Sequence, residues 1–112
     1  MPGLTTHVLD TASGHPAARV AVTLFEMVGN ERREIASAVT NADGRTDRPL
    51  LESVRQGQFE IVFDIGAYFA SRGMVPGFLD QVPVRFRITD ISRHWHVPLL
   101  ASPWGYTTYR GS

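Results

Sequence analysis

The stretch Arg19–Thr40, RVAVTLFEMVGNERREIASAVT, decides the fold class of this chain. Its first half, Arg19–Val28, is rich in β-branched residues, which favour extended structure. Alternate positions of that half share one apolar face: Val20, Val22 and Leu24. Gly29-Asn30 is a turn signal, and Arg33–Thr40 has the composition of a returning strand. The stretch therefore predicts a β-hairpin.

The same alternation recurs along the rest of the chain. Further strands are predicted at Leu4–Leu9, at Leu50 and Leu51, and at Gln58–Ile65, Val82–Ile91, His94–Leu99 and Trp104–Tyr109. Asp10–Ala18 and the turn Asn41-Ala42-Asp43-Gly44 read as loops, and Ala67–Arg72 reads as one short helix ended by Gly73. About eight short strands with one short helix predict an all-β fold, an antiparallel β-sandwich in a single domain, residues 1–112.

The composition restricts the classes of function. The 112 residues carry no formal net charge, which argues against nucleic acid or an acidic membrane as the main partner. No Cys is present, so a disulfide framework, a thiolate metal site and a cysteine nucleophile are excluded. No apolar run reaches membrane-spanning length, and the N-terminus lacks the plan of a signal peptide. A cytoplasmic protein is the resulting expectation.

Two histidine-containing segments are candidates for chemistry. His94-Trp95-His96 places both imidazoles on one face of a predicted strand, because side chains alternate with period two. His7 lies in the first predicted strand and could join them. Three interpretations fit these three histidines: a zinc site, a general base beside a second histidine that orients it, or a solvated surface without a function. Arg45, directly after a tight turn, could bind a planar amide or carboxylate through two parallel hydrogen bonds.

The last four residues, Tyr109-Arg110-Gly111-Ser112, are a third candidate. They place a phenol, a guanidinium, a hydroxyl and a carboxylate directly after strand-like sequence. Final residues usually fray, but an anchored strand would hold these groups in fixed positions, as a binding site requires. A domain of this size has little room for a deep pocket, so a surface cleft or a site between subunits is expected.

Taken together, four segments resemble the transthyretin-like 5-hydroxyisourate hydrolases of the transthyretin/HIUase family. The similar segments are Thr6-His7-Val8-Leu9-Asp10 through Gly14-His15-Pro16-Ala17, then Thr40-Asn41-Ala42-Asp43-Gly44-Arg45, His94-Trp95-His96-Val97-Pro98-Leu99-Leu100 and Ser102–Ser112. They occur in the family's order and span the chain almost end to end. Trp95 and Trp104 stand where tyrosine is expected, which implies altered packing rather than lost chemistry.

The resemblance implies a function and a site. The fold would be a transthyretin-like sandwich, and the reaction would be hydrolysis of 5-hydroxyisourate to 2-oxo-4-hydroxy-4-carboxy-5-ureidoimidazoline in urate degradation, with no cofactor or metal. By position, the catalytic residues would be His7, Arg45, His96 and Ser112, and the substrate-binding residues would be His7, Arg45, Tyr109, Arg110 and Gly111. The family also implies a homotetramer with sites at the interface between dimers.

Three alternatives remain open from the sequence. Transthyretin itself uses this fold to carry a small ligand, so a non-catalytic carrier is one alternative. A zinc-dependent hydrolase using His7, His94 and His96 is the second, and a purely structural sandwich module is the third. Which of the two catalytic histidines acts as the general base is also open.

Overall fold

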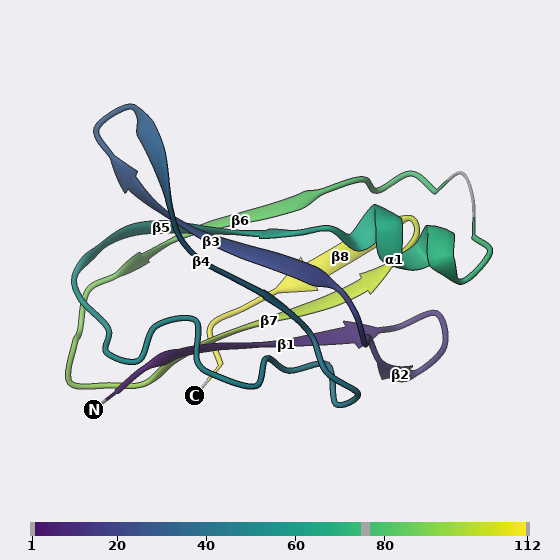
Figure 1. Ribbon diagram of the computed structural model, residues 1–112, viewed down its shortest axis with the longest axis horizontal. Helices are drawn as coiled ribbons and strands as arrows, with labels where there is room; N and C mark the ends of the chain where they lie inside the picture. The colour runs from purple at the N-terminus through teal and green to yellow at the C-terminus, as the bar shows by residue number, and fades with distance from the viewer. Residues whose placement is uncertain (1, 75–76, 112) are drawn as a thin grey trace.

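Two four-stranded sheets make up the protein, with a short helix at one end (Figure 1). The computed structural model describes residues 2–74 and 77–111. In chain order the elements are β1 (Leu4–Asp10), β2 (His15–Pro16), β3 (Ala21–Val28), β4 (Glu31–Val39), β5 (Gly57–Phe63), α1 (Ile65–Ser71), β6 (Val82–Ile88), β7 (Trp95–Ser102) and β8 (Gly105–Thr108). The first sheet has the order β2-β1-β7-β8, and the second has the order β4-β3-β5-β6.

The predicted all-β class and the short helix are confirmed, with local differences. The helix begins two residues before the predicted Ala67. Leu51 forms only an isolated bridge with Leu4 instead of a strand, whereas His15-Pro16, predicted as loop, pairs with the end of β1. One pairing, β1 with β7, is parallel, and all other pairings of the named strands are antiparallel.

The core lies between the sheets and is formed by alternate positions of each strand. In β1, Leu4, Thr6 and Val8 are buried while Thr5 and His7 are only half-buried. The predicted apolar faces of β3, with Val20 directly before it, and of β5 are fully buried: Val20, Val22, Leu24, Phe59, Ile61 and Phe63. This alternation leaves the polar side chains of β1 on the opposite face of their sheet, away from the core.

A buried polar contact ties the helix to the end of β1. The Tyr68 hydroxyl donates to Asp10 Oδ2 at 2.8 Å, and Asp10 Oδ1 accepts from the backbone N–H groups of Ala12 and Ser13. Burial alone would raise the pKa of Asp10, but these hydrogen bonds outweigh it and hold the pKa below 3.8. Burial and the neighbouring carboxylate raise the pKa of Tyr68 to about 12. This contact therefore fixes where β1 ends.

Replacing Tyr68 with Phe should lower the free energy of unfolding at pH 7 by about 1–3 kcal/mol, because a buried carboxylate loses a donor. The pKa of Asp10 is lowered on folding, so its contribution is complete above pH 3.8 and is lost as the pH falls through the folded-state pKa. Urea unfolding at pH 7 and in acid measures both effects, with the exposed Tyr106→Phe as control. Equal losses for the two variants at pH 7 would contradict this role.

Candidate active site

The register of β1 on β7 brings the predicted histidines together. In this parallel pairing Thr5 lies opposite His96, and His7 lies opposite Pro98. His7 and His96 are therefore diagonal neighbours on the face of the sheet that points away from the core. Two imidazoles from segments about ninety residues apart in the sequence therefore lie on one face of the same sheet.

Arg45 lies beside β1, at the edge of this strand that does not pair with β7. It forms an isolated antiparallel bridge with His7, and the Val8 N–H donates to the Gly44 carbonyl at 2.8 Å. Gly44 has a positive φ of 77°, and a Cβ there would collide with the Val8 carbonyl oxygen. Only glycine suits this close approach. The tight turn thus places the exposed Arg45 beside His7.

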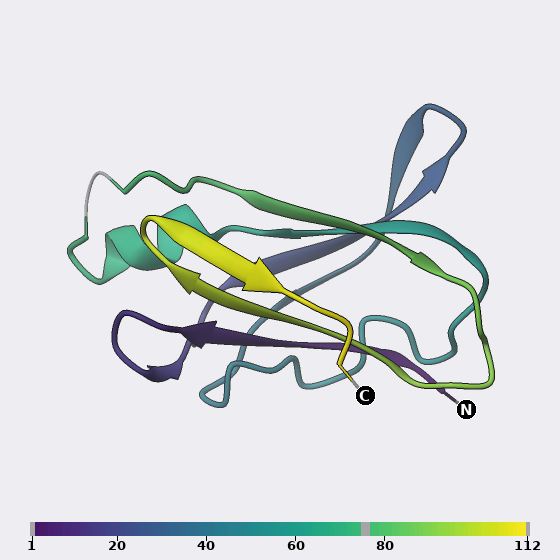
Figure 2. The same ribbon diagram turned by 180° about the vertical axis from the view of Figure 1, so that it is seen from behind.

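The chain end lies on the opposite side of β7. Strand β8 pairs with β7 as far as Thr108 opposite Leu99, where the ladder lapses because the next residue, Pro98, has no N–H. Pairing resumes three residues on, where the Gly111 N–H donates to the His96 carbonyl at 2.7 Å. The segment after β8, residues 109–111, is called the tail below. It stays in register with β7 and does not fray. Figure 2 shows this last segment running beside β7.

Gly111 packs directly on the imidazole of His96. A Cβ on Gly111 would lie 2.8 Å from His96 Cδ2 and 3.4 Å from His96 Cγ. The predicted binding residue Gly111 is thus buried against the predicted catalytic ring. Ser112 lies outside the described residues.

The imidazoles have defined hydrogen-bond partners. His7 Nε2 lies 2.8 Å from the backbone carbonyl oxygen of Asp43, so this nitrogen carries a proton and donates. The Thr5 hydroxyl lies between the other two rings, 2.8 Å from His96 Nδ1 and 2.9 Å from His94 Nε2. Thr5 was not among the residues predicted for the site, although its two-residue spacing from His7 places it on the same face.

The environment of His96 favours its neutral form. Burial of the ring lowers its pKa below 6.5, and the positive charges of Arg45, His7 and His94 add to this effect, while a hydrogen bond to the Thr5 backbone opposes it. A neutral imidazole at pH 7 can accept or donate a proton during a reaction. This is the electrostatic setting that acid–base chemistry needs.

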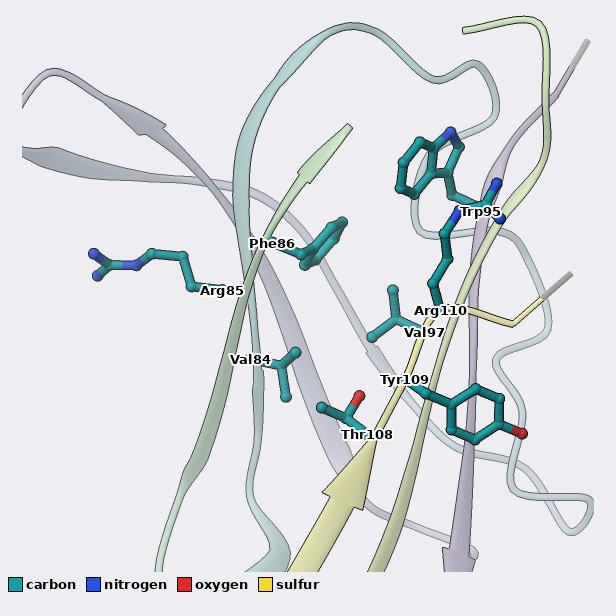
Figure 3. Close-up of a pocket in the computed structure, with 8 residues that line it drawn as sticks. All are labelled: Val84, Arg85, Phe86, Trp95, Val97, Thr108, Tyr109 and Arg110. Carbon is teal, nitrogen blue, oxygen red and sulfur yellow. The ribbon is translucent and has the colours of Figure 1, made fainter. Parts of the chain in front are cut away.

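Tyr109 and Arg110 extend to opposite sides of the tail. The Arg110 guanidinium carbon lies 4.3 Å above the Trp95 ring, which is a cation–π contact, and Nη2 donates to the His94 carbonyl at 3.5 Å. Both residues line a hollow of about 210 Å³ between β6, the start of β7 and the end of β8. In Figure 3 Arg110 extends beside Trp95, whereas the Tyr109 ring is turned away from Val84 and Phe86. The Arg110 side chain therefore anchors the tail on the Trp95 side and does not join His7 and His96.

The described residues do not form a metal centre. Among residues 2–74 and 77–111, no group of three His, Cys, Asp or Glu side chains is arranged to hold a metal ion. His94 Nε2 and His96 Nδ1 are both hydrogen-bonded to the Thr5 hydroxyl, so these two nitrogens do not face a shared metal position. The zinc alternative is therefore not supported. In the same described ranges no helix is long and apolar enough to cross a membrane.

Residues 4–111 match the model of the HIUase/Transthyretin family. The chain belongs to this family. A relative in Deinococcus radiodurans, named 5-hydroxyisourate hydrolase, is 54% identical over 117 aligned residues, which cover 99% of this chain and 97% of that protein. The solved structure of Klebsiella pneumoniae 5-hydroxyisourate hydrolase is 34% identical with a TM-score of 0.86, and each chain is covered in full. Sea bream transthyretin, solved in complex with thyroxine, is 30% identical with a TM-score of 0.90, covering 97% of this chain and 94% of that one. The resemblance inferred from the sequence is confirmed.

The charge of Arg45 should be measurable at His96. Replacing Arg45 with Gln removes one of the positive charges that lower the pKa of His96, so this pKa should rise toward 6.5 without passing it, because burial of the ring remains. NMR titration of the histidine ring protons measures the change. Arg87→Gln, at an exposed position of β6 in the other sheet, is the control and should leave the titration unaltered. An unchanged His96 in the Arg45 variant would mean that the two groups do not interact.

Gly111 should tolerate no side chain. Alanine at this position must displace either the tail or the His96 ring, so the His96 ring resonances should shift strongly while the unfolding midpoint changes little. Gly105→Ala is a matched control, since a Cβ there meets open space. If both variants leave the His96 resonances in place, the tail is not packed on this ring.

Proposed function

We propose that this protein hydrolyses 5-hydroxyisourate to 2-oxo-4-hydroxy-4-carboxy-5-ureidoimidazoline, a step of urate degradation, without a metal or cofactor. The observation that carries the proposal is the convergence of His7, Arg45 and His96 across one continuous set of β pairings. The relatives named 5-hydroxyisourate hydrolase, which match this chain over nearly its full length, support the same reaction.

The reaction needs a base for water and a donor for the substrate carbonyl. Water adds its oxygen to a ring carbonyl carbon and gives a proton to an imidazole. The C–N bond of the cyclic amide then breaks, and the departing nitrogen takes up a proton. A neutral imidazole has one nitrogen that accepts a proton and one that donates a proton, so His7 and His96 can together perform both transfers. Neither step requires an oxidant or a metal ion.

Arg45 and the tail complete the proposed site. A planar, electron-rich ring suits the guanidinium of Arg45, whose charge would also stabilise negative charge that develops on the carbonyl oxygen. Tyr109, on the same strand face as Gly111, would orient the substrate. Gly111 would contribute its packing on His96, and Arg110 would act by anchoring the tail on Trp95. Ser112 is proposed to complete a proton relay.

The proposal includes a homotetramer with sites at the interface between dimers. Arg45 and Tyr109 are exposed and the histidine patch lies on an open sheet face, so a single chain does not enclose a substrate. A second copy of the chain placed over this face would exclude bulk water, which strengthens the electrostatic interactions in the site. We further propose that residues 1–112 act as one domain and that the protein is cytoplasmic.

A hydrolase is favoured over a carrier. The transthyretin that was solved with thyroxine is 30% identical to this chain, whereas the relatives named as hydrolases reach 54%. A carrier channel has no need for two imidazoles beside a guanidinium, and this chain retains all three. A purely structural module would likewise leave the anchored tail without a role.

Replacing His96 with Asn should lower the rate by about 10²–10⁴-fold, as expected when a proton-transfer group is lost. The assay follows the absorbance decay of freshly generated 5-hydroxyisourate with and without protein. His15→Asn, an exposed histidine on β2, is the control and should retain the wild-type rate. Near-normal turnover by the His96 variant would remove this residue from the mechanism, and a wild-type protein that leaves the decay unchanged would refute the proposed function.

A further inference from the structure

We infer that Thr5 is a positioning residue that holds the proton of the His96 imidazole on Nε2, through a hydrogen-bond chain that begins at the Gly3 backbone and passes through His94. The tautomer assignment stands on geometry alone. Its effect on rate rests on the proposed hydrolase function.

The chain starts at a group whose direction is fixed. The Gly3 N–H can only donate, and its partner is His94 Nδ1 at 3.4 Å. His94 Nδ1 must therefore be the unprotonated nitrogen of that ring. In the neutral imidazole the proton then lies on Nε2, the nitrogen 2.9 Å from the Thr5 hydroxyl oxygen. His94 thus donates to Thr5.

The hydroxyl of Thr5 transmits this direction to His96. A hydroxyl has one proton to give, and with His94 donating to it that proton is directed at His96 Nδ1, 2.8 Å away. In the reverse order His96 Nδ1 would donate to Thr5, and Thr5 would donate to His94 Nε2. His94 Nδ1 would then carry a proton that faces the Gly3 N–H, so two hydrogens would lie between these two nitrogens. If both rings donated to Thr5, its own hydroxyl proton would have no acceptor among the hydrogen bonds of the described residues, so the forward order is the one that satisfies all three groups. His96 Nδ1 is therefore an acceptor, and its proton lies on Nε2.

The neutral state that this chain requires agrees with the surroundings of the ring. Burial lowers the pKa of His96, and the charged and titratable groups beside it, Arg45, His7 and His94, lower it further, against a smaller opposing effect of a hydrogen bond to the Thr5 backbone. A second proton on Nδ1 would also leave the Thr5 hydroxyl proton without this acceptor. Thr5 and its surroundings thus favour a single tautomer of His96.

The assignment separates the roles of the two catalytic histidines. His96 presents Nε2–H, which is a donor for a carbonyl oxygen or a departing nitrogen. His7 uses its Nε2–H on the Asp43 carbonyl, so in its neutral form Nδ1 carries the free lone pair. Among the described residues no hydrogen bond to either His96 Nε2 or His7 Nδ1 is present. His7 is then the group able to take the proton of water, and His96 is the group able to give one.

The test combines a spectroscopic measurement with kinetics. NMR of the histidine ring nitrogens at neutral pH should show wild-type His96 with a protonated Nε2 and an unprotonated Nδ1. Thr5→Val keeps the β-branched shape but removes the hydroxyl, so His96 should become a mixture of tautomers and kcat should fall by up to about 10²-fold. Thr5→Ser keeps the hydroxyl and should restore both. Thr6→Val is the matched control, because the Thr6 hydroxyl donates to the Val97 carbonyl on the other face of β1.

Each result decides the inference. A wild-type His96 protonated on Nδ1 overturns it without reference to activity. A Thr5→Val protein that loses rate while its His96 tautomer is unchanged also overturns it, since Thr5 would then be only a packing residue. Failure of Thr5→Ser to restore the tautomer has the same meaning. If wild-type protein lacks hydrolase activity but shows the expected tautomer and its loss in Thr5→Val, the proposed function fails and the hydrogen-bond chain is upheld.

Discussion

The parallel hydrogen-bonded ladder between β1 and β7 is the constraint on which the site depends. It joins seven residue pairs, from Leu4 opposite Trp95 to Asp10 opposite Ala101. A slip of one residue would turn His7 into the core and expose its apolar neighbours, because side chains alternate between faces. The burial of Leu4 and Val8 therefore fixes the register, and the register places the imidazoles. In this way the hydrophobic core determines the geometry of the polar face.

Further backbone pairing, on both sides of this ladder, positions the other site residues. The Gly44 turn adds Arg45 to β1, and the tail adds Gly111 to β7 after the gap at Pro98. Both additions use glycine where a side chain would collide with the neighbouring strand or ring. The site is therefore built on rigid elements, and loops contribute only short bridges. Such support suits chemistry that requires sub-ångström placement.

The sequence predicted most of this arrangement because the strands alternate strongly. Period-two patterns gave the faces of β1, β3, β5 and β7, and the family resemblance indicated His7, Arg45 and His96. The parallel partner of β1 was not predictable from local patterns, since Thr5 and His96 are 91 positions apart. Thr5 itself was missed because a strand threonine is a common residue with no distinctive spacing. The stacking of Arg110 on Trp95 was missed for a related reason, since the pattern does not reveal which face a tail residue meets after its strand ends.

The central claim is that imidazoles from two distant strands act as one catalytic unit. The most direct measurement is a double-mutant cycle on the rate of 5-hydroxyisourate hydrolysis with His7→Asn, His96→Asn and the combined variant. Residues that act as a unit are strongly non-additive, so the combined variant should be scarcely slower than the worse single variant. Rate losses that multiply, or a single variant with wild-type turnover, would show that the two histidines do not share one reaction site.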